Sequence, residues 1–300
     1  MKLLTFIENG QQKLGVKTDR GVIHISKALE SVSAKDHIAT TVHQVIEGGE
    51  AAISALQAFV NEALAAGGSY ILNEADLTYG PCVTHPNKMI CVGLNYRKHA
   101  EETNAPIPQY PILFNKFNNT LTGNGHDVQL PIKVTSKVDY EAELVIVIGK
   151  EAKYVDKENA LDYVFGYCNV NDLSARDLQL RTHQWLLGKS CDGFSPLGPY
   201  LVTADEVGNP NDLSIRCIVN GEVRQSSNTS DMIFHCDEIV SYISQHMTLV
   251  PGDIILTGTP EGVVLGYPED KQVYLKDGDV VTIEIEKLGS LTNRMVNERA

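Results

Sequence analysis

Three acidic side chains alternate along one short stretch of the sequence, at Asp139, Glu141 and Glu143. The residues that follow, as far as Gly149, are apolar and mostly β-branched, which predicts a buried strand. Because side chains alternate between the two faces of a strand, we expect the three carboxylates to point the same way. A hard divalent cation is the simplest group to offset their charge, since burying an unpaired carboxylate is costly. A solvated acidic face of a strand would show the same spacing.

A histidine and a glutamate, His99 and Glu102, lie three positions apart in a polar, helix-compatible segment. On a helix they would be neighbours, and a carboxylate beside an imidazole fixes its tautomer and prepares it to act as a general base. Surface pairs without a catalytic role have the same spacing. A further acidic residue, Asp172, follows a predicted strand at 164–170 and precedes a predicted helix that runs to about residue 185. Site residues and helix caps are both common at such a position.

The composition limits the classes of protein to which the chain can belong. It has 300 residues and a hydrophobic fraction of 43%, typical of a globular protein with a core. A formal net charge of -13 gives no electrostatic footprint for nucleic acid or for an anionic membrane. No stretch is long enough to span a bilayer, and the apolar run at the N-terminus ends at Glu8, too early for a signal peptide. The six scattered cysteines form no C-x-x-C pair, which argues against a zinc site or a disulfide scaffold and predicts a reduced, cytoplasmic protein.

The first 80 residues differ in pattern from the rest of the chain. Short predicted strands are followed by a helical pattern at 41–66, which breaks at the pair Gly48-Gly49. Few polar groups suited to chemistry cluster there. We therefore predict a small N-terminal α+β accessory domain, 1–80, and a catalytic domain, 81–300. In the second part, Asn220-Gly221 between two strand-like segments predicts a β-hairpin.

These residues belong to a set of segments that together resemble the fumarylacetoacetate hydrolase (FAH) superfamily. The segments run in family order from about residue 88 to the C-terminus, and the ordered set is specific although each segment alone is weak. They are Gly93-Leu94-Asn95-Tyr96 through His99 and Glu102, Asp139 to Leu144, Asn171-Asp172-Leu173-Ser174-Ala175-Arg176-Asp177 with Gln179, Gln184-Trp185 through Gly188-Lys189-Ser190, and Gly258-Thr259-Pro260. The chain looks most similar to bacterial members with an N-terminal extension that are labelled acylpyruvate hydrolases, hydroxyhepta-diene-dioate isomerases or oxaloacetate decarboxylases.

The resemblance implies a fold, a metal and a set of residue roles. The fold is α+β, with the β/β/α layers and mixed sheets of the FAH family, and members are usually homodimers. A divalent metal, Mg²⁺ or Mn²⁺, is implied for three carboxylates, which are Glu141, Glu143 and Asp172. The family's acid–base dyad, which lies on a segment that orders as a lid, corresponds to His99 and Glu102. The family's active-site lysine corresponds to Lys189. The family's substrate contacts fall on Arg176, Gln179 and Thr259.

Two positions depart from related chains. The larger animal FAH has an additional aspartate ligand seven residues before its catalytic histidine, and Val92 stands at that place here. This difference favours the simpler type of site with three carboxylates. The segment Lys116-Phe117-Asn118-Asn119 lacks the proline that often follows this lysine. Because the loop borders the site, the substrate preference stays open at that point.

The implied activity is divalent-metal-dependent hydrolysis of a carbon–carbon bond in acylpyruvate-type diketo acids, like fumarylpyruvate or fumarylacetoacetate. Three carboxylates and one divalent cation leave one negative charge, so Lys189 and Arg176 would be needed to attract an anionic keto acid. His99, oriented by Glu102, would deprotonate a water that attacks the distal carbonyl. Oxaloacetate decarboxylase and 2-hydroxyhepta-2,4-diene-1,7-dioate isomerase are alternatives that use the same site without an attacking water. A non-enzymatic alternative is a metal-dependent keto-acid binding protein.

Overall fold

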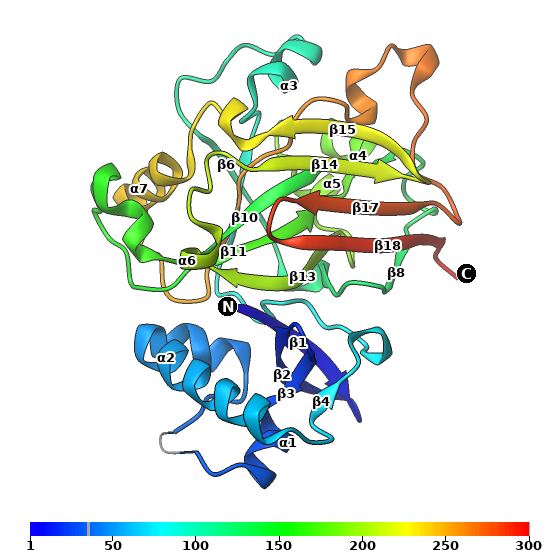
Figure 1. Cartoon of the computed structure of the whole chain (residues 1–300). Coiled ribbons are helices and arrows are strands. Elements are labelled where there is room, and N and C mark those ends of the chain that lie inside the picture. Colours follow the sequence, from blue (N-terminus) through cyan, green and yellow to red (C-terminus); the bar gives the residue numbers. More distant parts are fainter. Residues whose placement is uncertain (35–36, 300) are drawn as a thin grey trace.

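The computed structural model describes residues 1–34 and 37–299. Within them an eleven-stranded sheet runs through both parts of the molecule that are visible in Figure 1. Its strands lie in the order β4-β3-β2-β1-β13-β11-β10-β16-β5-β6, and β7 pairs with β13 beside this path. The pairing is mixed, because β5 (Met89–Gly93) runs parallel to β16 (Ile254–Leu256) while most other neighbours are antiparallel.

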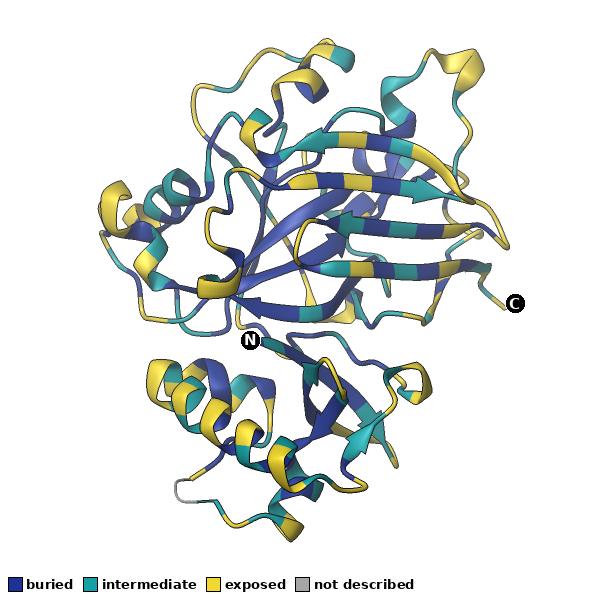
Figure 2. Ribbon diagram, in the orientation of Figure 1, coloured by how far each residue is buried: buried dark blue, intermediate teal, exposed yellow. Residues whose placement is uncertain are grey.

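The N-terminal part is a small sheet with two helices beside it. Its elements are β1 (Lys2–Glu8), β2 (Gln11–Thr18), β3 (Gly21–His24), α1 (Ile25–Ser31), α2 (Val42–Ala66), β4 (Ile71–Leu72) and the 3-10 turn η1 (Glu74–Asp76). The hydroxyl of Thr41 caps α2 by accepting a hydrogen bond from the Gln44 N–H. The predicted break at Gly48-Gly49 is confirmed, because Gly49 has φ 57° and ψ -142°, which glycine adopts at little cost. Figure 2 shows that α2 buries one face and exposes the other.

Strand β1 joins the N-terminal part to the main sheet. It pairs antiparallel with β13 (Ser195–Thr203), so that Leu3 lies opposite Leu201. One cluster of buried apolar side chains contains Leu3 and Phe59 of the N-terminal part together with Val145 of the main sheet. The two parts therefore share a core, and a division of the chain at residue 80 stays a prediction.

The central strands of the main sheet are covered on both faces. Strands β10 (Ala142–Ile148) and β11 (Val164–Asn171) are buried at every residue, which explains the continuous apolar run in the sequence. Leu144 and Ile146 face the second sheet, whereas Val145 and Val147 belong to the cluster that contains α2. The second sheet has the order β15-β14-β17-β18-β8. Its strands are β8 (Asp127–Leu130), β14 (Ser214–Val219), β15 (Glu222–Asn228), β17 (Val280–Ile285) and β18 (Gly289–Asn297).

Short elements fill the remaining connections. The strands are β6 (Ile112–Lys116), β7 (Leu121–Thr122), β9 (Val138–Asp139) and β12 (Ser174–Ala175), the last two forming a separate pair. The helices are α3 (Arg97–Glu102), α4 (Arg176–Gln179), α5 (Leu186–Lys189), α6 (Ala204–Val207) and α7 (Cys236–His246). The 3-10 turns are η2 (Asn118–Thr120), η3 (Lys157–Tyr163), η4 (Thr229–Asp231), η5 (Val264–Gly266) and η6 (Glu269–Lys271). Among the described residues, no helix has both the length and the apolar character needed to cross a bilayer.

Two local predictions have opposite outcomes. The hairpin at Asn220-Gly221 is confirmed: it joins β14 to β15, and both residues have positive φ, as a tight hairpin turn requires. The helix predicted to reach about residue 185 is wrong, because α4 ends at Gln179. Beyond it, the hydroxyl of Thr182 accepts from the Gln184 N–H and donates to its carbonyl. Such local hydrogen bonds compete with those of a helix.

Candidate active site

Strand pairing brings three predicted carboxylates together. In the antiparallel pair β10–β11, Ala142 lies opposite Asn171, so the start of β10 meets the end of β11. The Asp172 N–H donates to the carbonyl of Glu141 across this junction at 2.9 Å. Glu141, Glu143 and Asp172 are all buried, and one carboxylate oxygen from each lies within 4.8 Å of the others. The arrangement is one of buried oxygen ligands, which suits a hard divalent cation.

Asp139 takes a different place from the one that strand alternation predicts. Strand β9 ends at Asp139 and β10 begins at Ala142, so the alternation is interrupted between them. The Asp139 carboxylate is fully buried and forms an ion pair with Arg176, whose Nε lies 2.8 Å from Oδ2. It is therefore not one of the clustered carboxylates.

Three buried cations lie beside the carboxylate cluster. Lys189 Nζ is 2.6 Å from Glu141 Oε2 and 2.9 Å from Asp172 Oδ2, and Arg176 Nη1 is 2.8 Å from Glu141 Oε1. The third, Lys116, ends β6, and its Nζ contacts Asp172 Oδ1 and donates to the Phe194 carbonyl at 2.7 Å. Lys116 was missed as a site residue by the sequence analysis, which noted only the missing proline beside it. A lysine two positions after the apolar run Ile112-Leu113-Phe114 was the available signal.

The charges of the cluster are unevenly compensated. Burial alone would raise the pKa of Glu141, but the charges of Lys189 and Arg176 lower it to about 2. For Glu143, burial and the neighbouring charges of Asp172 and Glu141 raise the pKa well above its ordinary value. Glu143 Oε2 accepts a hydrogen bond from the Gly258 N–H at 2.9 Å, but it forms no ion pair with any residue of the described chain. A divalent cation would relieve this repulsion, so the donor set fits the implied metal.

The predicted histidine–glutamate pair is formed on α3. His99 Nδ1 lies 2.8 Å from Glu102 Oε1, and Glu102 Oε2 accepts a hydrogen bond from the Gly262 N–H at 2.9 Å. His99 is only 6% exposed, and the hydroxyl of Thr103 donates to its carbonyl at 2.8 Å. Asn95, just before α3, bonds through its side chain to the backbone of Phe234 and anchors the segment. His99 is therefore buried, whereas Glu102 is half-buried.

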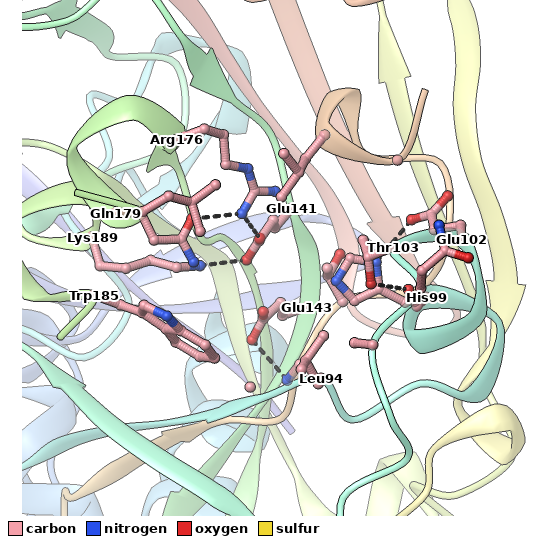
Figure 3. A pocket seen from close by; sticks show the side chains of 18 of the residues that line it. Leu94, His99, Glu102, Thr103, Glu141, Glu143, Arg176, Gln179, Trp185 and Lys189 are labelled. Carbon is pink, nitrogen blue, oxygen red and sulfur yellow. Dashed lines mark hydrogen bonds and ion pairs between the residues drawn. The ribbon is translucent and has the colours of Figure 1, made fainter. Parts of the chain in front are cut away.

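One cavity of about 620 Å³ connects these groups. Figure 3 shows Arg176, Glu141 and Lys189 on one side of it, and His99 with Glu102 on the other. Eight of the nine predicted site residues line it, namely His99, Glu102, Glu141, Glu143, Arg176, Gln179, Lys189 and Thr259. Asp172 lies behind them in contact with Lys116 and Lys189. The apolar part of the lining includes Leu94, Phe114, Leu180 and Trp185.

The predicted substrate contacts have defined partners. Arg176 Nη1 donates to Gln179 Oε1 at 2.9 Å, while Arg176 Nη2 is buried and has no hydrogen-bond partner in the described chain. Burial alone would lower the pKa of Arg176, but the charges of Asp139 and Glu141 outweigh it and raise the pKa. The hydroxyl of Thr259 donates to the Ala142 carbonyl at 3.0 Å. The roles of these residues toward a substrate stay predictions.

Residues 88–296 match the family model described as fumarylacetoacetate (FAA) hydrolase, C-terminal. The chain belongs to the fumarylacetoacetate hydrolase family. It is 45% identical over 258 residues to the mitochondrial oxaloacetate tautomerase FAHD2A of Bos taurus. The matched region covers 85% of this chain and 80% of the relative. This FAH-family chain is thus similar to a tautomerase along most of its length.

Several solved structures resemble this chain along its whole length. A putative HpcE protein from Mycobacterium smegmatis has a TM-score of 0.82 and 34% identity, and all of both chains is covered. The maleylpyruvate hydrolase from Sphingobium sp. SYK-6, in complex with manganese(II) ion and pyruvate, has a TM-score of 0.80 and 29% identity, again over all of both chains. The predicted α+β fold of the FAH family is therefore confirmed. The relatives differ in the reaction they carry out, so FAH membership does not by itself identify the reaction.

The prediction of a cytoplasmic protein is contradicted by the bovine relative, which is mitochondrial. The prediction rested on cysteine usage, and all six cysteines are indeed free thiols. Free thiols indicate only that the surroundings are reducing. They do not distinguish one reducing compartment from another, which is why the inference failed.

Proposed function

We propose that this protein is a divalent-metal-dependent enzyme that interconverts the enol and keto forms of oxaloacetate or a closely related 2-oxo acid. The observation that carries the proposal is that the His99–Glu102 pair lines the same cavity as Glu141 and Glu143. Tautomerisation needs only a proton transfer and stabilisation of an enolate. The similarity to an oxaloacetate tautomerase along 85% of the chain supports this choice of substrate.

Glu141, Glu143 and Asp172 are proposed to hold the metal, Mg²⁺ or Mn²⁺. Their clustered and incompletely compensated charge supports the assignment, as does the manganese(II) ion in the maleylpyruvate hydrolase neighbour. When bound, the cation would supply positive charge to the 2-oxo oxygen of the substrate. Lys189 would add a second positive charge beside it, since its Nζ already lies within 3 Å of two of these carboxylates.

The protein's own groups would bind the substrate and move its proton. Arg176 lines the cavity, and its Nη2 is buried without a partner in the described chain, so Nη2 is the donor proposed to bind the substrate carboxylate. Gln179 and Thr259 would contribute further polar contacts. Because Glu102 occupies His99 Nδ1, the other ring nitrogen, Nε2, is the one free to act. In enolisation, His99 Nε2 would take a proton from C3 of the keto form while the 2-oxo oxygen gains a proton from solvent, and ketonisation would reverse both transfers.

Hydrolysis of an acylpyruvate is a second candidate, favoured by the size and lining of the cavity. A volume of about 620 Å³ exceeds what a four-carbon acid fills. The aromatic pair Phe114 and Trp185, with ring centroids 5.3 Å apart, would accommodate an acyl group. In that reaction His99 would deprotonate a water instead of the substrate carbon. Decarboxylation of oxaloacetate would use the same groups without a water, and a homodimer is the proposed assembly in each case.

The test measures three reactions with the purified protein, each with EDTA, Mg²⁺ or Mn²⁺. They are ketonisation of enol-oxaloacetate, followed by its ultraviolet absorbance, release of pyruvate from oxaloacetate, and loss of acetylpyruvate. Controls contain metal without protein, because divalent metals promote the first two reactions alone. His99→Asn is the matched variant. Metal-dependent ketonisation that this variant abolishes would support the tautomerase.

Three other outcomes of the same assays would support a different function. Faster loss of acetylpyruvate than of the enol would favour the hydrolase, and pyruvate release alone would favour the decarboxylase. Binding of Mn²⁺ and a keto acid without turnover would leave only a binding protein.

A further inference from the structure

Asp139 is a fully buried carboxylate that belongs to neither the proposed metal ligands nor the cavity lining. It accepts three hydrogen bonds from two separate parts of the site. Oδ2 accepts from Arg176 Nε at 2.8 Å and from the Leu265 N–H at 3.0 Å, and Oδ1 accepts from the Val264 N–H at 2.9 Å. The first partner is the proposed carboxylate-binding residue, and the other two belong to η5. One side chain therefore connects Arg176 with a segment 125 residues away from Asp139.

Asp139 is one of three side chains that contact the Arg176 guanidinium. Its Nε–H is used by Asp139, and Nη1 donates to Gln179 and pairs with Glu141. Only Nη2 is left without a partner in the described chain. Because the guanidinium is planar, the Asp139 contact at the Nε edge helps to fix where the free Nη2 group points. Without that contact, the group would be held from the Nη1 side alone.

The other partners of Asp139 lie on a segment that supports the proposed acid–base dyad. Residues 262–268 contain Leu265, Gly266, Tyr267 and Pro268, which line the cavity. The Gly262 N–H donates to Glu102 Oε2 at 2.9 Å. At Gly266 the same carboxylate lies so close that a Cβ would be 2.5 Å from Glu102 Oε2. The Glu102 carboxylate therefore contacts this segment at two positions, Gly262 and Gly266.

We propose that Asp139 is a positioning residue that couples Arg176, and hence the substrate carboxylate, to residues 262–268, on which Glu102 and through it His99 depend. The proposal rests on the proposed function for the substrate, but its structural half does not. It assigns Asp139 a part in catalysis without contact with the substrate. It also means that the two sides of the cavity are linked by one buried carboxylate as well as by the substrate.

A purely structural role for Asp139 is the competing explanation, and Asp253 provides the matched control. Asp253 is also fully buried, and it too accepts two backbone N–H bonds and one from a cation, from Lys88 N, Val250 N and Lys88 Nζ. It does not line the cavity. Asp139→Asn and Asp253→Asn therefore remove the same charge from the same kind of setting, once beside the site and once away from it.

The experiment compares both variants with the wild type by steady-state kinetics on enol-oxaloacetate and by hydrogen exchange of the metal-free protein. Asp139→Asn is expected to raise KM at least about tenfold, because a charged hydrogen bond that orients Arg176 is lost. It is also expected to speed amide exchange across residues 262–268. Asp253→Asn should lower the unfolding temperature while leaving KM and the exchange of that segment at wild-type values.

Each result decides the proposal. Wild-type KM and exchange in Asp139→Asn would overturn it, and so would a change in only one of the two, since the coupling requires both. Equal effects in Asp253→Asn would also overturn it, because they would reflect general destabilisation. If the wild type acts on none of the substrates, the proposed function fails, and faster exchange in residues 262–268 then still tests the structural half.

Val264→Pro provides a second variant in case Asp139→Asn does not fold. Proline fits the first position of η5, and Val263 before it has φ -66° and ψ 155°, which a following proline accepts. The change removes the hydrogen bond to Asp139 Oδ1 and, because Val264 is fully buried, also part of its side-chain packing. Faster exchange across residues 262–268 with a lower kcat and unchanged KM would support the proposal, and unchanged exchange and kcat would overturn it.

Discussion

The surroundings of Glu143 favour a bound cation, because in the metal-free protein its carboxylate is buried beside two other carboxylates. Burial and the charges of Asp172 and Glu141 raise its pKa above the ordinary value of 4.5. Such a group contributes stability below that value, and the contribution is lost as the pH rises through the folded-state pKa. At neutral pH, Glu143 therefore stabilises the fold less than a neutral side chain would.

Glu143→Gln is accordingly expected to separate stability from metal binding. The variant keeps an oxygen for the Gly258 N–H, so the metal-free protein should gain about 1 kcal/mol at neutral pH. Its affinity for Mn²⁺ should fall at least about a hundredfold, because one charged ligand is lost. Calorimetric unfolding in EDTA and a Mn²⁺ titration measure the two effects. A metal-free variant less stable than the wild type would contradict this account of Glu143.

Lys116 leads to a second prediction at the residue scale. Lys116→Met removes one of the two lysines that contact Asp172, and breaking a buried ion pair typically costs about 3 kcal/mol. Added Mn²⁺ should restore part of this loss by replacing the positive charge. Denaturant unfolding with EDTA and with Mn²⁺ measures the difference. In the control Lys88→Met, whose Nζ pairs with the remote Asp253, the metal should restore nothing beyond its effect on the wild type.

Strand spacing predicted that Glu141 and Glu143 lie together, and the family resemblance added Asp172, Lys189 and Arg176, but Lys116 was not predicted as a counter-ion. Glu141 and Glu143 were found because the period of a strand is local. The partners of Asp139 and Asp172 depend on how distant segments pack: Arg176 lies 37 positions from Asp139, and Lys116 lies 56 positions from Asp172. The prediction that Asp139 joins the other acids failed because β9 and β10 are separate strands.

At the scale of elements, the end of β5 and the turn before α5 meet at Gly93 and Trp185. A Cβ at Gly93 would collide with the indole and lie 2.8 Å from its Cη2. Phe114 packs edge-on against the same ring at a centroid distance of 5.3 Å. The indole is therefore confined by two neighbouring strands, β5 and β6, on one wall of the cavity.

Gly93→Ala should displace this indole and change the cavity. Because Trp185 is the only tryptophan of the chain, its fluorescence reports on the cavity wall directly. We expect a shifted emission maximum and a KM several-fold higher for the substrate, with an unfolding free energy lower by about 1–3 kcal/mol. An unchanged spectrum and KM would mean that the ring has room to accept the methyl group. Gly125→Ala is a control for the loss of a glycine away from Trp185, although its positive φ adds its own strain.

The sequence predicted elements well where their signals are short in range. The hairpin turn at Asn220-Gly221 and the break at Gly49 depend on backbone conformations that few residues adopt, and both are confirmed. The division of the predicted helix after Asp172 into α4 and α5 had no comparable signal. It depends on packing, since Gly188 of α5 lies against the backbone of Gln179.

At the scale of the whole molecule, Glu74 ties the N-terminal part to the main sheet. Its carboxylate accepts hydrogen bonds from Tyr79, at 2.5 Å, and from Tyr200 of β13, and it pairs with Lys17 of β2. Burial alone would raise the pKa of Glu74, but the hydrogen bonds from Lys17 and the two tyrosines outweigh it and lower the pKa below 4.5. The stability that Glu74 contributes is therefore present above about that pH and is lost as the pH falls through the folded-state pKa.

Glu74→Gln should cost about 1–2 kcal/mol of unfolding free energy near neutral pH. The difference from the wild type should shrink as the pH falls below 4.5, where the wild-type carboxylate takes up its proton. Denaturant titrations at several pH values measure both. Glu50→Gln, whose partner Lys150 is also exposed, is the control and should change nothing. A constant difference at all pH values would contradict the role of the charge.

The way the site balances its own charge has a consequence for how the protein is made. Four buried carboxylates, Asp139, Glu141, Glu143 and Asp172, lie among three buried cations, Lys116, Arg176 and Lys189. Only one negative charge is left over, so folding on the ribosome need not wait for a metal, unlike that of a zinc finger. We expect a finished chain to acquire its ion afterwards. The choice between magnesium and manganese would then follow from the supply of free ions where the folded protein resides.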